Sequence, residues 1–237
     1  MSRIVRQSKY RHVFGKAFKR EKCYDNIKLS RNAWDSNYIC ANLKFFAVCV
    51  EAAGGGSFVV VPFEVKGKLK SDFPLVAGHK AAVLDLDFNP FNDHLVASAS
   101  EDGTAKIWAI PEGGLTETVR DAVQNLTGHK RKVGSVNWNP TANNVLATSS
   151  TDYAVKLWDV EKGQAKNTVD GHGNIIQTCA WNYDGSQLVT ACKDKKVRLL
   201  DPRSNAIVSV SFAFFVFGCY YYYYIFKTIY WFIFLFL

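Results

Sequence analysis

Three sets of Ser or Thr, His and Asp residues recur along this chain, and these are the side-chain types of a nucleophile, a general base and its orienting acid. Each His follows a Gly, an Asp comes 23, 23 and 22 residues later, and a Ser or Thr stands four residues before that Asp. A hydrolase needs one such constellation, so a threefold copy at near-constant spacing favours a structural role. The sets are His79, Ser98 and Asp102; His129, Thr148 and Asp152; and His172, Thr190 and Asp194.

Other candidates for chemistry are weaker. The glycine run at 54–56 lacks the Gly-Lys-Ser/Thr ending of a phosphate-binding loop and lies between two strand-like runs, so we expect a hairpin turn there. The six cysteines contain no C-x-x-C pair, and neither metal-ligand spacing nor paired catalytic carboxylates occur. The sequence therefore predicts no metal, no cofactor and no enzyme activity.

Short strands are the elements that must position the repeated side chains. The repeats, at about 79–110, 129–160 and 172–203, each hold three apolar or alternating runs split by turn residues. Trp108 and Trp158 follow their Asp by six residues, where the third repeat has Leu200. This pattern resembles the WD-repeat family of β-propellers, whose units recur about every 40–45 residues and supply one four-stranded blade each.

The WD-repeat resemblance implies that the His, Ser or Thr, Asp and Trp of one repeat form one buried hydrogen-bonded network. Such a pairing is also what burial demands of polar side chains. Because Leu200 has no indole donor, we expect the third network to be shorter.

The charge of the chain is concentrated at its start. Residues 1–31 hold ten of the 29 Lys and Arg residues but two of the 21 acidic residues, so this arm carries the whole net charge of +8. A compact basic arm is steered toward an acidic partner. Aromatic residues are sparse among its charges, which makes nucleic acid an unfavoured partner. The start has no apolar signal segment, so we expect a cytoplasmic protein with reduced cysteines.

The basic arm and the segment after it indicate which group of WD-repeat proteins the chain resembles. Residues 1–75 resemble the opening of coronins, the actin-filament-binding propeller family, and the resemblance extends over about residues 4–207. The stretches that carry it include Val5-Arg6-Gln7-Ser8-Lys9, Arg11-His12-Val13-Phe14-Gly15, Glu51-Ala52, Val133-Gly134, Asn139-Pro140-Thr141-Ala142 and Asp201-Pro202-Arg203. The resemblance implies binding of filamentous actin through basic residues near the N-terminus. The candidates are Lys28, Arg31, Arg6, Lys9 and Arg11.

Lys28 is the strongest of these candidates. In Ile27-Lys28-Leu29, the alternation of a strand would place Ile27 and Leu29 in the core and Lys28 in solvent. Coronins usually carry Arg at the corresponding place, so Lys28 keeps the charge but loses the two-pronged hydrogen bonding of a guanidinium.

The predicted fold is all-β, a partial WD-repeat propeller of about four of the family's seven blades with an aromatic, hydrophobic C-terminal tail. We assign residues 1–75 to the basic segment and the first blade, 76–205 to three WD-repeat blades, and 206–237 to the tail. No coiled-coil heptad is present, so oligomerisation through a coiled coil is not expected of this chain.

The tail has two competing interpretations. Between 206 and 237 the one charged side chain is Lys227, and the charge-free stretch 206–226 is long enough to span a bilayer. Runs of Tyr and Phe are unusual for a membrane helix, however, and A/T-rich codons specify such residues. Composition therefore favours translated intron sequence over a membrane anchor, and we expect the tail to lie outside the native fold.

Two functions follow from these observations. The first is a non-catalytic coronin-like protein that binds actin filaments and organises the cytoskeleton in the cytoplasm. The alternative is a propeller scaffold that binds other proteins through its surface, with a basic arm on anionic lipid or nucleic acid and a membrane location if the tail is an anchor.

Overall fold

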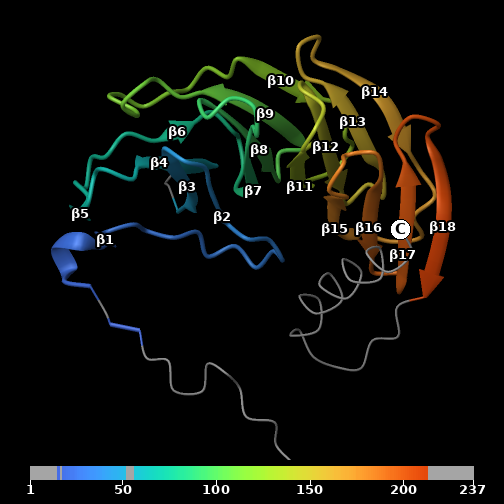
Figure 1. Cartoon of the computed structure of the whole chain (residues 1–237), viewed down its shortest axis with the longest axis horizontal. Coiled ribbons are helices and arrows are strands. Elements are labelled where there is room, and N and C mark those ends of the chain that lie inside the picture. Colours follow the sequence, from blue (N-terminus) through green and yellow to red (C-terminus); the bar gives the residue numbers. More distant parts are fainter. Residues whose placement is uncertain (1–14, 17, 52–55, 213–237) are drawn as a thin grey trace, which may run out of the picture.

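The computed structural model describes residues 15–16, 18–51 and 56–212, and these residues form an all-β protein (Figure 1). Four antiparallel sheets of four strands follow one another along the chain. The first blade contains β2 (Ile39–Ala41), β3 (Phe45–Val50), β4 (Ser57–Pro62) and β6 (Val76–Ala77), and the second contains β7 (Val83–Phe88), β8 (Leu95–Ser100), β9 (Thr104–Ala109) and β10 (Gln124–Thr127). The third contains β11 (Val133–Trp138), β12 (Val145–Ser150), β13 (Val155–Asp159) and β14 (Gln164–Val169), and the fourth contains β15 (Ile176–Trp181), β16 (Leu188–Cys192), β17 (Lys196–Asp201) and β18 (Ala206–Phe212).

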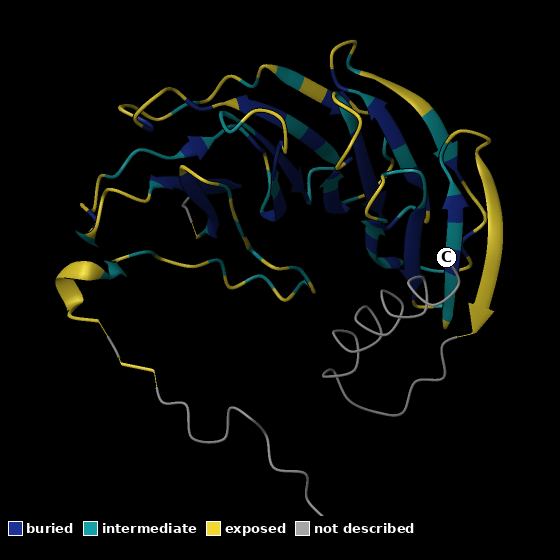
Figure 2. Ribbon diagram, in the orientation of Figure 1, coloured by how far each residue is buried: buried dark blue, intermediate teal, exposed yellow. Residues whose placement is uncertain are grey.

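The four sheets fan out in an arc, with β2, β7, β11 and β15 in contact along its inner side (Figure 1). Each sheet is thus one propeller blade, and the predicted all-β partial propeller of about four blades is confirmed. Figure 2 shows β7 and β11 mostly buried and β15 buried or intermediate, whereas β2 at one end of the arc and β18, the outermost strand of the fourth blade, are largely exposed.

The sequence repeats at about 79–110, 129–160 and 172–203 each cover the first three strands of a blade, and the fourth strand lies after the end of the repeat. Strand β10 precedes Gly128-His129 in the chain but pairs with β9, so it completes the second blade. In the same way, β6 ends just before Gly78-His79 and completes the first blade. Each Gly-His pair therefore marks the passage of the chain from the outer strand of one blade to the inner strand of the next.

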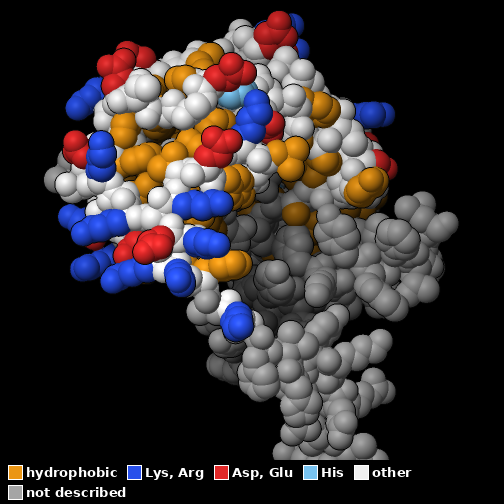
Figure 3. Space-filling view, turned by 60° about the vertical axis from the view of Figure 1, so that its left-hand side comes forward, with side chains coloured by type: hydrophobic (Ala, Val, Ile, Leu, Met, Phe, Trp, Pro, Cys, Tyr) orange, Lys and Arg blue, Asp and Glu red, His pale blue; other side chains and the backbone are white. Residues whose placement is uncertain are grey.

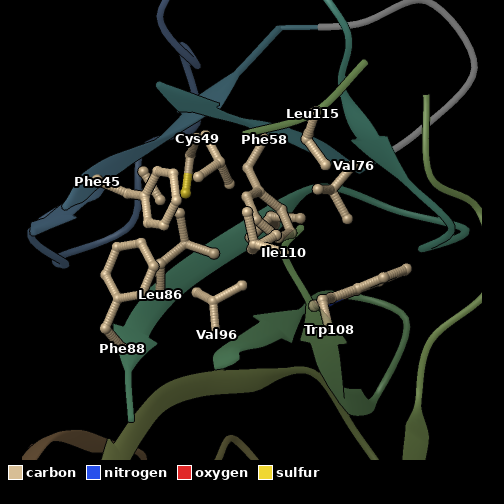
Figure 4. Close-up of a cluster of buried hydrophobic side chains, with 13 residues drawn as sticks. Phe45, Cys49, Phe58, Val76, Leu86, Phe88, Val96, Trp108, Ile110 and Leu115 are labelled. Carbon is tan, nitrogen blue, oxygen red and sulfur yellow. The ribbon is translucent and has the colours of Figure 1, made fainter. Parts of the chain in front are cut away.

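The core lies between the blades. Figure 4 shows the layer between the first two, in which Phe45 and Phe58 of the first blade face Leu86 and Trp108 of the second. Each such side chain contributes about 1.5–3 kcal/mol by leaving water. Two further layers of the same kind join the second blade to the third and the third to the fourth.

The far side of the first blade is covered by the N-terminal segment. There β1 (Tyr24–Asp25) pairs in parallel with β5 (Gly67–Lys68), after a single 3-10 turn, η1 (Arg20–Lys22). Tyr24, Ile27 and Phe73 pack on a cluster of buried side chains from β3 and β4. This packing fixes the backbone just before Lys28.

The structure corrects two expectations about the elements. Residues 27–31 do not form a strand with a buried Leu29: one bridge joins Leu29 to Val50, and the Leu29 side chain is 60% exposed. Only the tip of β3 extends beyond β2 at this point, so the segment finds a partner for just a few residues. The prediction of a buried Leu29 was wrong, because no neighbouring strand runs along the whole segment.

The second correction concerns the start of the tail. Residues 206–212 are not outside the fold, because they form β18 and pair with β17 from Lys196↔Phe212 to Asp201↔Ala206. Ile207, Val208, Val210 and Phe212 are of the β-branched and aromatic types that are enriched in strands. Residues 213–237, on which the anchor and intron hypotheses depend, lie outside the described residues. Within the described part, no helix is long and apolar enough to cross a membrane.

Candidate functional site

The structure brings the first two Ser/Thr-His-Asp-Trp sets together. In the second blade, Nδ1 of His79 lies 2.9 Å from Oδ2 of Asp102, and Nε2 of His79 lies 2.7 Å from Oγ of Ser98. The Trp108 indole N–H donates to the same Ser98 oxygen at 2.8 Å. The tautomer that satisfies every group has His79 donating from Nδ1 to Asp102 and accepting the Ser98 proton at Nε2.

The third blade repeats this geometry. The His129–Asp152, His129–Thr148 and Trp158–Thr148 hydrogen bonds measure 3.0, 2.8 and 2.8 Å. The carboxylate of Asp152 also accepts the backbone N–H of Lys130 at 2.9 Å, and so ties the loop before β11 to the turn after β12.

Electrostatics keep these networks in one protonation state. Burial lowers the pKa of His79 and of His129, so both rings are neutral. Burial would raise the pKa of Asp102, but hydrogen bonds from His79 and Thr104 outweigh it and hold that pKa well below its usual range. The Ser98 side chain is fully buried, and its oxygen already accepts the Trp108 indole N–H. A nucleophile in this position would have neither a free oxygen nor access to a substrate.

The fourth blade departs from this pattern. His172 keeps its bond to Thr190 at 2.9 Å, but Leu200 supplies no indole, and Nδ1 of His172 has no hydrogen-bond partner among the described residues. Asp194 pairs instead with the buried Arg198 through two hydrogen bonds of 2.5 and 3.2 Å. Burial and the nearby Arg198 lower the pKa of His172 to about 4.

The shorter third network is therefore accompanied by a change that sequence analysis did not foresee. Arg198 stands opposite Thr190 in the β16–β17 register, where the second and third blades place Lys106 and Lys156. A planar guanidinium can hold a carboxylate at two points, whereas a lysine cannot. In the sequence, this change was indicated only by the Arg at position 198, where the other two repeats have Lys.

Two carboxylates on the inner strand of the second blade bind the third blade. Oδ2 of Asp85 accepts the Val136 N–H at 3.1 Å, and Oδ2 of Asp87 accepts the Trp138 N–H at 2.8 Å. They thereby satisfy donors on the open edge of β11. Burial raises the pKa of each carboxyl to about 7.

Four asparagines missed by sequence analysis hold the turns at the other end of the inner strands. Their Oδ1 atoms accept backbone N–H groups of the turn that follows, and two Nδ2 groups reach a carbonyl of the next blade, Asn42 to Asp93 at 2.8 Å and Asn139 to Gly185 at 2.9 Å. A signal was present, since the last three recur with the period of the Gly-His pairs. The four are Asn42, Asn89, Asn139 and Asn182.

The basic residues proposed to bind a partner are placed in different ways. Lys28 is exposed and forms no ion pair within the described part of the chain, whereas Arg31 lies 3.5 Å from Glu51. Arg20 is likewise paired with Asp25 at 3.0 Å. Arg6, Lys9 and Arg11 lie outside the described residues.

The structure adds lysines from another segment to this basic region. Lys66, Lys68 and Lys70 alternate along the segment around β5, and Lys70 shares with Lys28 the lining of a 230 Å³ pocket. Figure 3, which brings this end of the molecule forward, shows Lys and Arg side chains gathered beside exposed hydrophobic ones. The alternating lysines were visible in the sequence, but only the parallel β1–β5 pairing places them beside the N-terminal arm.

Comparisons with known proteins agree with this geometry. Residues 68–109, 120–159 and 163–201 match a family model described as WD domain, G-beta repeat, and residues 3–68 match one described as a domain of unknown function, DUF1899. Coronin-A of Dictyostelium discoideum is 62% identical over 209 residues, which cover 88% of this chain and 47% of that protein. Human Coronin-2B is 51% identical over 203 residues, which cover 86% of this chain and 42% of that protein.

A crystal structure of the WD40 domain of Toxoplasma gondii coronin superposes with a TM-score of 0.77 at 29% identity, over 83% of this chain and 50% of that one. The repeated networks, the blades and the repeat matches together define a WD-repeat β-propeller. The DUF1899 match and the identity with coronins then narrow the class, and the chain belongs to the coronin family. It spans less than half the length of the two coronins named above.

Proposed function

We propose that this chain is a non-catalytic cytoskeletal protein whose basic N-terminal surface, around Lys28, binds actin filaments in the cytoplasm. The observation that supports it most is the state of Lys28, an exposed lysine without an ion-pair partner among the described residues. The backbone at Lys28 is fixed, because its carbonyl accepts the Glu51 N–H at 3.0 Å. Membership of the coronin family supplies the partner.

The charge balance around Lys28 favours an acidic partner. Arg20 and Arg31 are paired with acids, whereas Lys28 and the lysines near β5 are exposed and form no ion pair among the described residues. A cationic surface raises the rate of encounter with an acidic one, and this effect weakens as salt is added. Arg31 remains part of the proposed surface, as do Arg6, Lys9 and Arg11 of the arm. Other proteins would bind elsewhere on the propeller.

A non-catalytic role accords with the state of the Ser/Thr-His-Asp sets. In the second and third blades each hydroxyl is buried and engaged by both a His and a Trp. We propose that all three sets are structural.

The direct test is co-sedimentation of the full chain with actin filaments. Lys28→Asp places like charge against the acidic partner and should weaken binding about tenfold or more at low salt, with an unchanged melting temperature. The control is Lys162→Asp, since Lys162 is also exposed but lies in the β13–β14 turn, 3.9 Å from Asp159. Equal losses in the two variants would exclude a special role for Lys28.

The same preparation tests the alternative function. Binding to anionic vesicles and to RNA is measured at the same salt concentration as binding to filaments. Tight vesicle or RNA binding together with weak filament binding would favour the scaffold with a lipid- or nucleic-acid-binding arm.

A further inference from the structure

The segment that follows Lys28 crosses from the first blade to the third. We call residues 31–38 the strap. Its Ser36 hydroxyl donates to the carbonyl of Leu84 on β7, and its Trp34 indole N–H donates to the carbonyl of Gly134 on β11 at 3.0 Å. The Trp34–Gly134 contact joins residues 100 positions apart in the chain. The strap thus ties the N-terminal segment to the inner strands of the second and third blades.

Both carbonyls that receive the strap lie at the same structural position. The inner strands β7 and β11 each carry an irregularity in their pairing, between Val83 and Asp85 in one and between Val133 and Ser135 in the other. A bulge of this kind leaves one residue without its ladder partner. Leu84 and Gly134 are those residues, so the strap uses backbone acceptors that the sheets leave free.

Trp34 fits its place because residue 134 is a glycine. A Cβ on Gly134 would overlap the Trp34 ring. The ring is also covered by Lys132, whose Nζ lies 4.9 Å from its centre, and Lys132 is held by Glu101 at 3.4 Å. A cation over an indole face is an attractive arrangement. The Trp34 ring is thus packed between Gly134 and Lys132, and we call this packing site the Trp34 seat.

Tyr38 makes the strap rigid from within. Its hydroxyl oxygen accepts the Trp34 N–H at 2.9 Å and lies 2.7 Å from the carbonyl oxygens of both Asn32 and Trp34. The Tyr38 side chain therefore holds the turn between Asn32 and Tyr38 closed.

The stretch from Lys28 to Arg31, which leads into the strap, is attached to β3. The Ser30 N–H donates to the Cys49 carbonyl at 3.0 Å, and the Glu51 N–H donates to the Lys28 carbonyl at 3.0 Å. Lys28 is thus itself part of the attachment to β3, and Arg31 lies between that attachment and the Trp34 seat.

We propose that Trp34 is a positioning residue, which holds the Lys28–Arg31 stretch in the geometry that an acidic partner surface requires. This inference rests on the proposed function. Trp34 acts through the backbone and through its seat on Gly134, and needs no contact with the partner. Preorganisation of this kind raises affinity by lowering the entropy that binding must remove.

The test compares variants at both sides of the seat in the full chain. Trp34→Ala and Gly134→Ala should each weaken filament binding about fivefold, because either change frees the strap. Trp34→Phe retains an aromatic ring over Gly134 and should restore most of the affinity. Gly173→Ala is the matched control, since a Cβ there would come no closer than 3.3 Å to Asp194.

Two readouts separate positioning from general loss of stability. Amide hydrogen exchange at Ser30 and Glu51 should become faster in Trp34→Ala, while exchange in β12 and β16 stays unchanged. The dependence of filament affinity on salt should keep its slope in Trp34→Ala, because no charge is removed, and should become shallower in Lys28→Asp.

The outcomes distinguish this inference from the proposed function. If Lys28→Asp weakens binding while Trp34→Ala and Gly134→Ala bind as the unmodified chain does, the positioning role is overturned and the proposed function stands. If Lys28→Asp binds filaments normally, the proposed function fails, and the positioning role for this partner fails with it. Should Trp34→Ala not fold, normal binding by Gly134→Ala would still overturn the inference.

Discussion

The buried carboxyl group of Asp85 makes the stability of the contact between the second and third blades depend on pH. It accepts a hydrogen bond from Val136 of the third blade, yet burial raises its pKa from 3.8 to about 7. The folded protein therefore binds more protons than the unfolded chain between these two values. From this group alone, the free energy of unfolding falls as pH rises from about 4 to about 7 and levels off above that.

Asp85→Asn should accordingly stabilise the protein at pH 8. The amide keeps an oxygen for the Val136 N–H but cannot ionise, so the gain should be on the order of 1 kcal/mol or more. At pH 5 the same variant should gain much less. Chemical denaturation at the two pH values measures both numbers, and an equal gain at pH 5 and pH 8 would contradict the titration of Asp85.

Asp152 makes the opposite kind of contribution. It is bound by His129 and by the Lys130 N–H, so Asp152→Ala leaves buried donors without an acceptor and should lower the free energy of unfolding by about 1–3 kcal/mol. Denaturation at pH 7 measures the loss. An unchanged stability combined with abolished filament binding would show that the set is functional and not structural.

At the scale of single residues, the sequence could predict the side chains that recur with the repeat. It could not predict contacts that are made in only one blade. The His, Ser or Thr, Asp and Trp sets recur with the repeat, and the structure brings them together. The exchange of His172 for Arg198 as the partner of Asp194 depends on one side chain in one blade. The seat of Trp34 joins segments 100 residues apart, and no local pattern reports such a contact.

At the scale of the element, the glycine of the Gly-His pair has a physical role. A Cβ on Gly78 would overlap the carbonyl oxygen of Arg120 and lie 2.7 Å from the Trp108 ring of the same repeat. In the next repeat, Gly128 stands under the Trp158 ring in the same way, and a Cβ there would lie 3.3 Å from that ring. Motif glycine and motif tryptophan thus pack on each other across a blade.

Gly78→Ala should therefore lower the free energy of unfolding by about 1–3 kcal/mol, as overpacking of a filled site does. Gly173→Ala should cost less, because the atom nearest to a Cβ there, in the Asp194 carboxylate, is 3.3 Å away and is not overlapped. Thermal unfolding of the two variants side by side measures the difference. Equal melting temperatures would mean that the ring moves aside at Gly78 without cost.

Strands were predictable where a neighbour runs beside them for their whole length. The inner and middle strands of the blades meet this condition, and their apolar runs marked them in the sequence. Ile27–Leu29 does not meet it, because β3 extends past β2 by only a few residues. β18 lies in a stretch that looked foreign by composition, yet its alternation suits the open edge of β17.

At the scale of the whole molecule, β18 leaves an apolar edge in solvent. Val208, Val210 and Phe212 are 56, 47 and 71% exposed, and no charged side chain interrupts the strand. A long, uncharged edge strand is a template for pairing with another chain. We expect the chain to associate through this edge as its concentration rises.

The double variant Val208→Lys, Val210→Lys should reduce that association and leave the melting temperature unchanged. Light scattering across a concentration series measures the effect. Val123→Lys is the control, since Val123 is 63% exposed but lies just before β10 of the second blade. Equal reductions in both proteins would assign the effect to net charge and not to the β18 edge.

The offset between repeat and blade bears on how such a molecule can grow by gene duplication. A copied segment with the bounds of a matched repeat, such as 120–159, carries β10, the outer strand that closes the blade before it, and then three strands of its own blade. An inserted copy is therefore fastened to both neighbours by the chain itself, without any new surface having to evolve. The unit that is inherited differs from the unit that folds, and this mismatch makes the array extendable one blade at a time.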